Sequence, residues 1–444
     1  MKIAFVGGGS VLWNPILTTD MALTDELAGA ELVLHDIDLD ALELMTRTSK
    51  RIVEQVGGQL EVTATADRVE ALRDADFVIV SVAIGGLEAM RNDLEIPERY
   101  GVYQSVGDTV GPGGLARALR NIPFIVKVAR EMETLCPDAW LLNVTNPMTT
   151  LCRAVTRTTS VRIIGLCHEA TGVCHHLAKL LAVPTDAITL DVLGINHLPV
   201  ISQFNIDGND GMPLLRDWLV SHDPFAFVEE HDPDPGRDIF ADRLAVKLTL
   251  LEQLGVLFGA GDRHVAEFFP GFLTAASEWG KRYGVGLTTI KHREDGARER
   301  RARIERFVAG EPGELPESGN LRKSEEQMAP VMAALSGGPS GRFIVNIPNV
   351  GQIDNLPRDA VVECVAQVDD FGVRPLAAGA LPYAASAVIA PHVVRQELIV
   401  EAALTGRREP ALAALATDPL VRDSGTVVPM LDELLSANEA YVKD

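Results

Sequence analysis

The sequence predicts an α/β protein whose N-terminal part is a doubly wound parallel sheet. Residues Lys2–Val6 form a short apolar run that ends in glycines, and Glu31–Leu34 form a second run followed closely by Asp36. A segment of helix length separates the two runs, which is the spacing of a β-α-β unit. At 444 residues the chain exceeds the roughly 250–300 residues at which one hydrophobic core stops growing, so we expect two packed domains.

Further apolar runs extend this pattern through the first part of the chain. They are Asp76–Val82, Ala139–Asn143 and Val161–Gly165. Each run is largely apolar rather than alternating, which is typical of parallel strands buried on both faces. We therefore expect several parallel strands in one twisted, Rossmann-like sheet.

The residue pattern of the sequence changes after about Leu193. Loops become longer and acidic, as in His222–Arg237, and helices dominate from about Ile239. Strand-like runs return at Arg342–Asn346 and Ala360–Cys364 before helices rich in Ala and Leu. We expect the Rossmann-like domain at residues 1–193 and an α+β catalytic domain at residues 194–444.

Composition and charge exclude several classes of protein. The formal net charge of −22 argues against a nucleic-acid-binding surface, which needs a face rich in Lys and Arg. No apolar run reaches the roughly 18–20 residues that cross a bilayer, and the first residues do not resemble a signal peptide. The five cysteines suit free thiols in a reducing compartment. We therefore expect a cytoplasmic protein that binds neither nucleic acid nor membrane.

A glycine-rich turn follows the first predicted strand. Gly7, Gly8, Gly9 and Ser10 open a helix, where a backbone without side chains can approach a pyrophosphate at the helix N-terminus. Leu12 takes the place of the third glycine of the usual dinucleotide fingerprint, so a plain tight turn is the alternative. Asp36 ends the second strand and can bind ribose hydroxyls while repelling a 2′-phosphate. These residues favour NAD over NADP.

Two asparagines follow a late strand in the segment Asn143-Val-Thr-Asn146-Pro147. Ligands of open α/β sheets bind at the carboxyl edge of the strands, where this segment is expected to lie. We assign Asn143 to the cofactor, and Asn146 is a further candidate for ligand binding at this edge. The alternative is an Asn-Pro turn without a ligand.

A thiolate and an imidazole can converge at the same sheet edge. Cys167 follows a predicted strand, and His197 occurs thirty residues later in Gly194-Ile-Asn-His197. Both side chains are good ligands for a divalent transition metal. A structural zinc site with Cys174 is the alternative, although the spacing fits no common zinc motif.

A second charged cluster lies in an apolar segment. Asp262, Arg263, His264 and Glu267 occur in Gly261–Pro270, which is otherwise too apolar to lie in solvent. Buried charges need partners, so this cluster is a candidate for substrate binding or catalysis.

Seven motifs in chain order carry a resemblance to one family, and together they span essentially the whole chain. By these motifs the sequence resembles glycoside hydrolase family 4, the NAD- and manganese-dependent glycosidases. The motifs are Gly7–Ser10, Gly111–Pro123, Asn143–Pro147, Cys167–Glu169, Gly194–His197, Gly261–His264 and Val345–Asn349.

The resemblance implies redox-assisted elimination instead of displacement by two carboxylates. In this family NAD+ oxidises C3 of the sugar, a base removes the acidified C2 proton, and the aglycone leaves from C1. Water then adds and C3 is reduced again. The resemblance implies that Cys167 and His197 hold Mn2+ or another divalent metal, that Asp262 is the base and that His168 protonates the leaving oxygen.

The residues after the metal-binding cysteine resemble those of members that act on non-phosphorylated α-glycosides. Such members cleave α-glucosides, α-galactosides or uronides, and a related branch cleaves sulfoquinovosides. Ala170 stands where Val is usual, and Leu198-Pro199 replace a more aromatic continuation, which leaves the sugar open. An anionic C6 group could be bound bidentately by arginines. The expected substrate-binding residues are Asn146, Glu169, Arg91, Arg263 and His264.

Two other functions compete with this interpretation. An NAD-dependent dehydrogenase of the lactate/malate type shares the expected architecture, but its hydride transfer needs no metal at Cys167 and His197. An NAD-sensing regulatory protein would not need these residues together with Asp262 and His168. The resemblance also implies a homodimer or homotetramer.

Overall fold

The computed structural model describes residues 1–444 except 225, 227–240, 312–314, 317–320 and 443–444. Most of the acidic loop predicted at 222–237, and the predicted start of the helical region at 239, lie outside the described residues. Within the described part of the chain, no helix has both the length and the apolarity needed to span a bilayer.

The first six strands form a parallel sheet in the order β3-β2-β1-β4-β5-β6. This is the strand order of a dinucleotide-binding doubly wound fold, so the predicted fold class is confirmed. The predicted ends of β1, β4, β5 and β6 lie within two residues of the observed ends, and β2 extends one residue beyond its predicted end. The strands are β1 (Lys2–Val6), β2 (Glu31–His35), β3 (Glu61–Thr65), β4 (Phe77–Val80), β5 (Trp140–Asn143) and β6 (Arg162–Gly165).

Strand β3 was not predicted from the sequence. It reads Glu-Val-Thr-Ala-Thr and is largely exposed or half-buried, because it lies at the edge of the sheet. An edge strand lacks the continuous apolar run that marks the central strands, and β4 shows the contrast with all four residues buried.

The same sheet continues into the second half of the chain. Strand β10 pairs antiparallel with β6 through Asn346 and Gly165, and the path then runs β10-β11-β7-β8-β9 with β12 beside β11. These strands are β7 (Ile188–Ile195), β8 (Leu198–Ile206), β9 (Asn209–Asp210), β10 (Gly341–Pro348), β11 (Val361–Asp369) and β12 (Gly372–Pro375). The boundary expected between residues 193 and 194 therefore falls inside β7 and not in a linker, and the two parts share one sheet.

Helices cover the parallel strands, as the connections between parallel strands require. Helix α2 begins after Asp38, whose side chain accepts a hydrogen bond from the Ala41 amide, and ends at Gly57 with φ of 68°, both common helix-end features. The helices of this part are α1 (Trp13–Ala22), α2 (Leu39–Val56), α3 (Arg68–Leu72), α4 (Gly86–Arg99), α5 (Gly111–Leu135), α6 (Met148–Thr158) and α7 (Glu169–Leu181).

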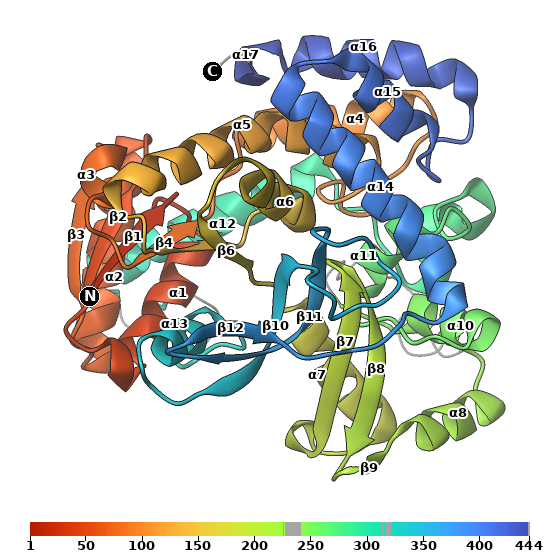
Figure 1. Ribbon diagram of the computed structural model, residues 1–444, viewed down its shortest axis with the longest axis horizontal. Helices are drawn as coiled ribbons and strands as arrows, with labels where there is room; N and C mark the ends of the chain where they lie inside the picture. Colours follow the sequence, from red (N-terminus) through yellow and green to blue (C-terminus); the bar gives the residue numbers. More distant parts are fainter. Residues whose placement is uncertain (225, 227–240, 312–314, 317–320, 443–444) are drawn as a thin grey trace.

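The C-terminal helices fold back over the N-terminal ones. Figure 1 shows α14 crossing over α5 and α6, with α15 and α16 beside it, and the contacts between these helices agree. The later helices are α8 (Met212–Ser221), α10 (Ala245–Leu254), α11 (Asp262–Val265), α12 (Ile290–Ala309), α13 (Met328–Leu335), α14 (Tyr383–Thr405), α15 (Arg408–Ala416), α16 (Val427–Ala437) and α17 (Glu439–Val442). Short 3-10 helices are η1 (Asp25–Leu27), η2 (Thr185–Ala187), η3 (Ala266–Phe268), η4 (Ala275–Tyr283) and η5 (Ser424–Thr426).

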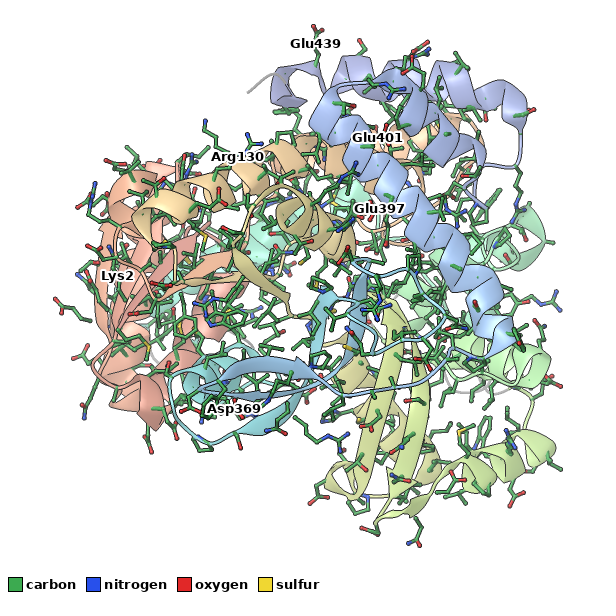
Figure 2. All side chains as sticks on the ribbon, viewed as in Figure 1. Lys2, Arg130, Asp369, Glu397, Glu401 and Glu439 are labelled. Carbon is green, nitrogen blue, oxygen red and sulfur yellow. The ribbon has the colours of Figure 1, made fainter. Side chains whose placement is uncertain are left out.

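One large apolar core joins the two parts. It contains Phe5 of β1, Leu141 of β5, Phe258, Val345 of β10 and Met430 of α16, all essentially inaccessible to solvent. Charged side chains such as Arg130 and Glu439 project from the outer helices instead (Figure 2). Because the sheet and the core are shared, residues from both halves can meet at the carboxyl edge of the parallel strands.

Candidate active site

A cavity of about 1220 Å³ lies at the carboxyl edge of the parallel strands. Its walls come from the turns after β1, β2, β4, β5 and β6, from the turn between β7 and β8, and from α11 and α12. Ligands of doubly wound sheets bind in this position. The cavity is large enough for a dinucleotide with a second small molecule, given that drug-sized sites span roughly 300–1,000 Å³.

The glycine turn forms one end of the cavity. The amides of Gly7 and Gly8 both donate to the His35 carbonyl at 2.9 Å, and Gly7 has φ of 90°. A Cβ on Gly7 would lie 2.1 Å from the Ser81 carbonyl oxygen, so only glycine fits there. Gly7, Gly9 and Ser10 line the cavity, whereas Gly8 packs against Leu34.

Asp36 joins the turn to the second strand. Its Oδ2 accepts a hydrogen bond from the Gly9 amide at 2.9 Å, and a Cβ on Gly9 would lie 2.7 Å from the same oxygen. Asp36 also lines the cavity. The narrow glycine backbone beside a carboxylate fits the pyrophosphate and ribose of NAD.

The two asparagines after β5 have different environments. Asn143 is fully buried, and its side chain holds the turn through the Thr145 amide and carbonyl. The assignment of Asn143 to the cofactor is therefore corrected: its side chain maintains the turn and is not part of the cavity lining. Asn146 does line the cavity, and among the described residues its buried Oδ1 has no hydrogen-bond partner.

His197 is placed by a tight hairpin. Strands β7 and β8 pair up to Ile195 and Leu198, so Asn196 and His197 form a two-residue turn in which His197 has φ of 65°. Asn196 anchors this turn by donating to the buried Glu363 carboxylate at 2.8 Å. Positive φ is uncommon for a residue with a side chain and often marks a functional site.

Cys167 and His197 meet at the candidate cation site. The Cys167 Sγ lies 3.4 Å from His197 Nε2, while His197 Nδ1 contacts Thr109 Oγ1 at 2.9 Å. The second contact orients the ring so that Nε2 faces the thiol. Burial raises the pKa of the Cys167 thiol, and a bound divalent cation would favour its thiolate.

Two further possible ligands adjoin this pair. His264 lies against His197 with ring centroids 3.8 Å apart, and Asp108, His197 and His264 offer ligand atoms within 4.8 Å of one another. The buried Nδ1 of His264 lacks a hydrogen-bond partner within the part of the chain that the structure describes. Thiolate, imidazole and carboxylate donors suit a transition-metal ion, so these residues fit a divalent cation. Cys174, considered above for zinc, packs instead in a separate apolar cluster.

Glu169 connects the first turn of α7 to the segment before α11. Its Oε2 accepts a hydrogen bond from the Gly261 amide at 2.7 Å, and its Oε1 lies 3.6 Å from His264 Nε2. Burial would raise the pKa of Glu169, but His264 and His197 hold it well below its usual range. Glu169 is therefore a fixed negative charge in the cavity wall.

His168 is held by a carboxylate from a distant segment. Its Nδ1 donates to Glu326 Oε1 at 2.8 Å, and the His168 side chain stays half exposed at the cavity. The hydrogen bond with Glu326 raises the pKa of His168 to about 9. His168 is therefore protonated at neutral pH and can donate a proton.

Asp262 lies at the start of α11 in a buried charged cluster. Its carboxylate accepts hydrogen bonds from the Val246 and Lys247 amides and from Lys247 Nζ, and Lys247 Nζ also binds Asp242 at 2.5 Å. A carboxylate has about four acceptor positions, so one remains. Burial and the nearby Asp242 raise the pKa of Asp262 to about 6. Asp262 and Asp242 both line the cavity.

Three arginines line the wall near Asp108. They are Arg117, Arg263 and Arg293. Arg117 Nε donates to the Asn146 carbonyl at 2.9 Å, and Arg293 donates to the Val106 carbonyl at 3.0 Å. Burial alone would raise the pKa of Asp108, but His264 and Arg117 hold it below its usual range.

Arg91 is not brought to this site. It lies on the outer side of α4, where its guanidinium pairs with Glu95 at 3.0 Å and Glu294 at 2.5 Å. Its side chain is 41% exposed, and the cavity lining does not include it. The expectation that Arg91 binds substrate is therefore corrected, because both carboxylates hold it at the surface.

The sequence analysis missed Asp108, Arg117, Arg293 and Glu326. Asp108 precedes the Gly111–Pro123 motif and Arg117 lies inside it, so that motif was a usable signal for both. Arg293 belongs to a helix with many arginines, and Glu326 follows two other polar residues. Neither local context distinguishes them from surface residues.

The fold and the site together define a class: a dinucleotide-dependent enzyme with a cation site beside the cofactor crevice. Comparison with known proteins makes this specific. The model of the family 4 glycosyl hydrolases matches residues 2–183, and that of their C-terminal domain matches residues 192–421. The chain belongs to the family 4 glycosyl hydrolases, as the seven motifs predicted.

Two relatives with assigned activities match over almost their whole length. An α-galacturonidase of Thermoanaerobacterium saccharolyticum is 35% identical over 100% of this chain and 96% of its own. An α-galactosidase of Bacillus subtilis is 30% identical over 100% of this chain and 99% of its own. The predicted enzyme class, a glycosidase, is confirmed, and the dehydrogenase alternative loses its support.

Solved structures agree. The Bacillus subtilis protein named lplD superposes with a TM-score of 0.90 at 32% identity, covering 98% of this chain and 99% of its own. The 6-phospho-β-glucosidase of Thermotoga maritima, solved with manganese, NAD+ and glucose-6-phosphate, superposes with a TM-score of 0.78 at 25% identity over 100% of both chains. The expected cofactor pair, NAD and a divalent metal, agrees with that structure.

Proposed function

We propose that this enzyme hydrolyses α-glycosides of uronic acids, galacturonides first among them. The observation that carries this proposal is the group of guanidinium groups in the cavity wall, from Arg117, Arg263 and Arg293, beside the candidate cation site. Guanidinium groups bind carboxylates through charge-assisted hydrogen bonds. The similarity to an α-galacturonidase supports the same substrate class.

In this proposal NAD and the cation bind to different residues. Gly7, Gly9, Ser10 and Asp36 would hold NAD, and Cys167 and His197 would hold the cation with His264 and Asp108 adjacent. When bound, NAD supplies reversible hydride transfer at C3 and the cation supplies polarisation of the sugar oxygens at C2 and C3.

The protein's own residues move the protons. Asp262, with a pKa of about 6, accepts the C2 proton in its ionised form. His168, with a pKa of about 9, gives a proton to the leaving oxygen. Both protonation states coexist near neutral pH, which is the condition for general base and general acid to act together. Asn146, Glu169, Arg263 and His264 bind the sugar.

The test is a panel of 4-nitrophenyl α-glycosides with NAD+, Mn2+ and a thiol reductant in D2O. The panel contains the galacturonide, glucuronide, galactoside, glucoside and sulfoquinovoside. We expect the galacturonide to be cleaved fastest and its product to carry deuterium at C2. Fastest cleavage of the neutral galactoside, or of the sulfoquinovoside, would overturn the substrate class, and cleavage without deuterium uptake would overturn the mechanism.

Stoichiometric measurement of NADH in the same reactions separates hydrolysis from net oxidation. A glycosidase of this kind releases sugar with no accumulation of NADH. NADH formed in proportion to product would instead favour a dehydrogenase.

We also propose the setting in which the enzyme works. All five cysteines are free thiols, which suits a cytoplasmic location, and the charge of −22 disfavours nucleic acid as a partner. A homodimer or homotetramer is the proposed assembly. Light scattering after size exclusion gives the assembly, and cell fractionation gives the location.

A further inference from the structure

Helix α12 is a basic helix with one face in the cavity wall. Its sequence contains six arginines and lysines between Lys291 and Arg303. Arg293, Ala297 and Arg300 line the cavity and are spaced four and three residues apart, which places them on one helix face. The helix packs against α2 and α4. Helix α12 therefore contributes the guanidinium groups of Arg293 and Arg300 to the cavity wall.

Arg293 is the residue of this face that interacts with the candidate cation site. Its charge interacts with Asp108, Arg263, Arg117 and Glu267, and Asp108 belongs to the candidate cation group. Burial lowers the pKa of Arg293 only to about 10, so its guanidinium remains charged at neutral pH.

Positive charge exceeds negative charge around Arg293. Burial raises the pKa of Glu267 to about 8, so this group is largely neutral at pH 7. The charges of Arg263 and Arg117 also act on Arg293, and Asp108 is the other carboxylate among its charged neighbours. In a chain whose net charge is −22, this local excess favours an anionic ligand.

The three guanidinium groups differ in their hydrogen bonds to protein acceptors. Arg117 gives its Nε to the Asn146 carbonyl, and Arg263 directs Nη1 to Thr288 Oγ1 at 3.4 Å. Arg293 uses Nη2 for the Val106 carbonyl, but its buried Nε has no hydrogen-bond partner among the residues described. A buried donor without a partner costs free energy unless a ligand satisfies it.

We propose that Arg293 is the specificity-determining residue that binds the C6 carboxylate of the uronic acid unit. This inference rests on the proposed function and adds the residue responsible for it. The carboxylate accepts hydrogen bonds from Nε and the remaining N–H groups of Arg293, and it compensates the excess positive charge beside Asp108. A neutral hydroxymethyl group at C6 cannot compensate this charge and does not pair with the guanidinium group in the same way.

The test compares Arg293→Gln with Arg298→Gln. Arg298 lies on the same helix, its side chain is 75% exposed, and it pairs with Asp295. For Arg293→Gln we expect kcat/KM on 4-nitrophenyl α-galacturonide to fall about 10- to 100-fold, the range of a charge-assisted hydrogen bond. The fall should reside mainly in KM. Activity on the galactoside and the Kd of NAD should stay within about threefold, and Arg298→Gln should match the wild type.

Inhibition by D-galacturonic acid and by D-galactose gives a second readout that does not depend on turnover. Arg293→Gln should weaken inhibition by the acid and leave inhibition by the neutral sugar unchanged. Arg293→Lys keeps the positive charge but lacks the planar guanidinium group. It replaces Arg293→Gln in the test if the glutamine variant is unstable to heat. We expect Arg293→Lys to lose selectivity for the acid as well.

The outcomes separate the two proposals. If the wild type cleaves no uronide, the proposed function fails. If the wild type cleaves the uronide but Arg293→Gln retains wild-type selectivity, or loses both substrates equally while folded, the inference fails and the proposed function stands.

Discussion

Several residues of the site are held in states that they would not adopt alone. His197 has a positive φ at the turn of a hairpin, and Asn196 beside it is tied to the buried Glu363. His168 is bound by Glu326, from a segment more than 150 positions away in the sequence. Each constraint costs conformational freedom and gives an oriented functional group.

The cation site depends on His197. His197→Ala should abolish turnover and weaken Mn2+ binding strongly, because the variant removes the imidazole that faces Cys167 at 3.4 Å and ligand loss typically costs more than the 10–100-fold seen for indirect contacts. NAD binding, measured by fluorescence titration, should be unchanged, since the glycine turn is separate. Mn2+ affinity is measured by calorimetry. Full activity in excess metal would contradict the assignment.

Glu267 should make stability depend on pH. Its pKa in the folded protein, raised by burial to about 8, exceeds the value of 4.5 expected in the unfolded chain. The stability associated with its protonated form is therefore fully present below about pH 4.5 and is lost as the pH rises through about 8. Glu267→Gln keeps the oxygen that accepts from the Val106 and Gly107 amides but cannot ionise.

The measurement is the free energy of unfolding of both proteins between pH 5 and pH 8. The variant and the wild type should be similar at pH 5, and the variant should become relatively more stable toward pH 8, by about 1.4 kcal/mol for each unit of pKa shift at most. A constant difference across this range would show that Glu267 is ionised throughout.

At the scale of elements, the site is assembled from turns that end strands. The turn after β1 supplies the glycines, the turn after β6 supplies Cys167, and the β7–β8 hairpin supplies His197. Strands hold these turns in a fixed arrangement, because their backbones are paired along their length. Helix α12 adds arginines from the second half of the chain.

The turn between β1 and α1 should tolerate no side chain at Gly9. A Cβ there would lie 2.7 Å from Asp36 Oδ2 and 3.0 Å from the Ala41 Cβ, so Gly9→Ala must displace the Asp36 carboxylate from the Gly9 amide. We expect the Kd of NAD to rise about tenfold, the effect of losing about 1.4 kcal/mol, with little change in Mn2+ binding. Gly271→Ala is the control, since a Cβ at Gly271 meets no atom within 4 Å. Unchanged NAD affinity in Gly9→Ala would refute the role of this turn.

At the scale of the whole molecule, a buried ion pair between α4 and α5 holds the C-terminal segment through a hydrogen bond to Asn438. Arg120 of α5 binds both oxygens of Asp93 of α4 at 2.7 Å and also donates to Asn438 at 2.8 Å. The side chains of Arg120 and Asp93 are 1% and 0% exposed. Tyr441, just beyond Asn438, lines the cavity near Gly85, so this fastening also completes the cofactor side of the cavity.

Breaking this pair should destabilise the protein strongly. Arg120→Met leaves the Asp93 carboxylate buried without its cation, which costs about 3–5 kcal/mol in comparable cases. Arg120→Met with Asp93→Leu should recover most of that loss, because two apolar side chains leave no buried charge. Denaturant unfolding of the three proteins measures the effect. If the double variant is no more stable than the single one, the cost comes from packing and not from the unpaired charge.

Five of the six parallel strands, the glycine turn, Asp36, and the pair Cys167 and His197 could be predicted from the sequence alone. These features are local: a buried strand shows as an apolar run, and a turn that must approach a cofactor shows as glycine directly after it. The motifs in chain order were sufficient to identify the family.

The folded structure was needed to show which charged residues meet. Asp108, Arg293 and Glu326 come from segments far apart in the chain, and of the three only Asp108 lies beside a recognisable motif. Arg91 had an equally plausible sequence context but is held at the surface by Glu95 and Glu294, and Asn143 is turned into its own loop. The charge state of a side chain depends on its burial and on its neighbours in space. The role of a charged residue is therefore defined only in the folded chain.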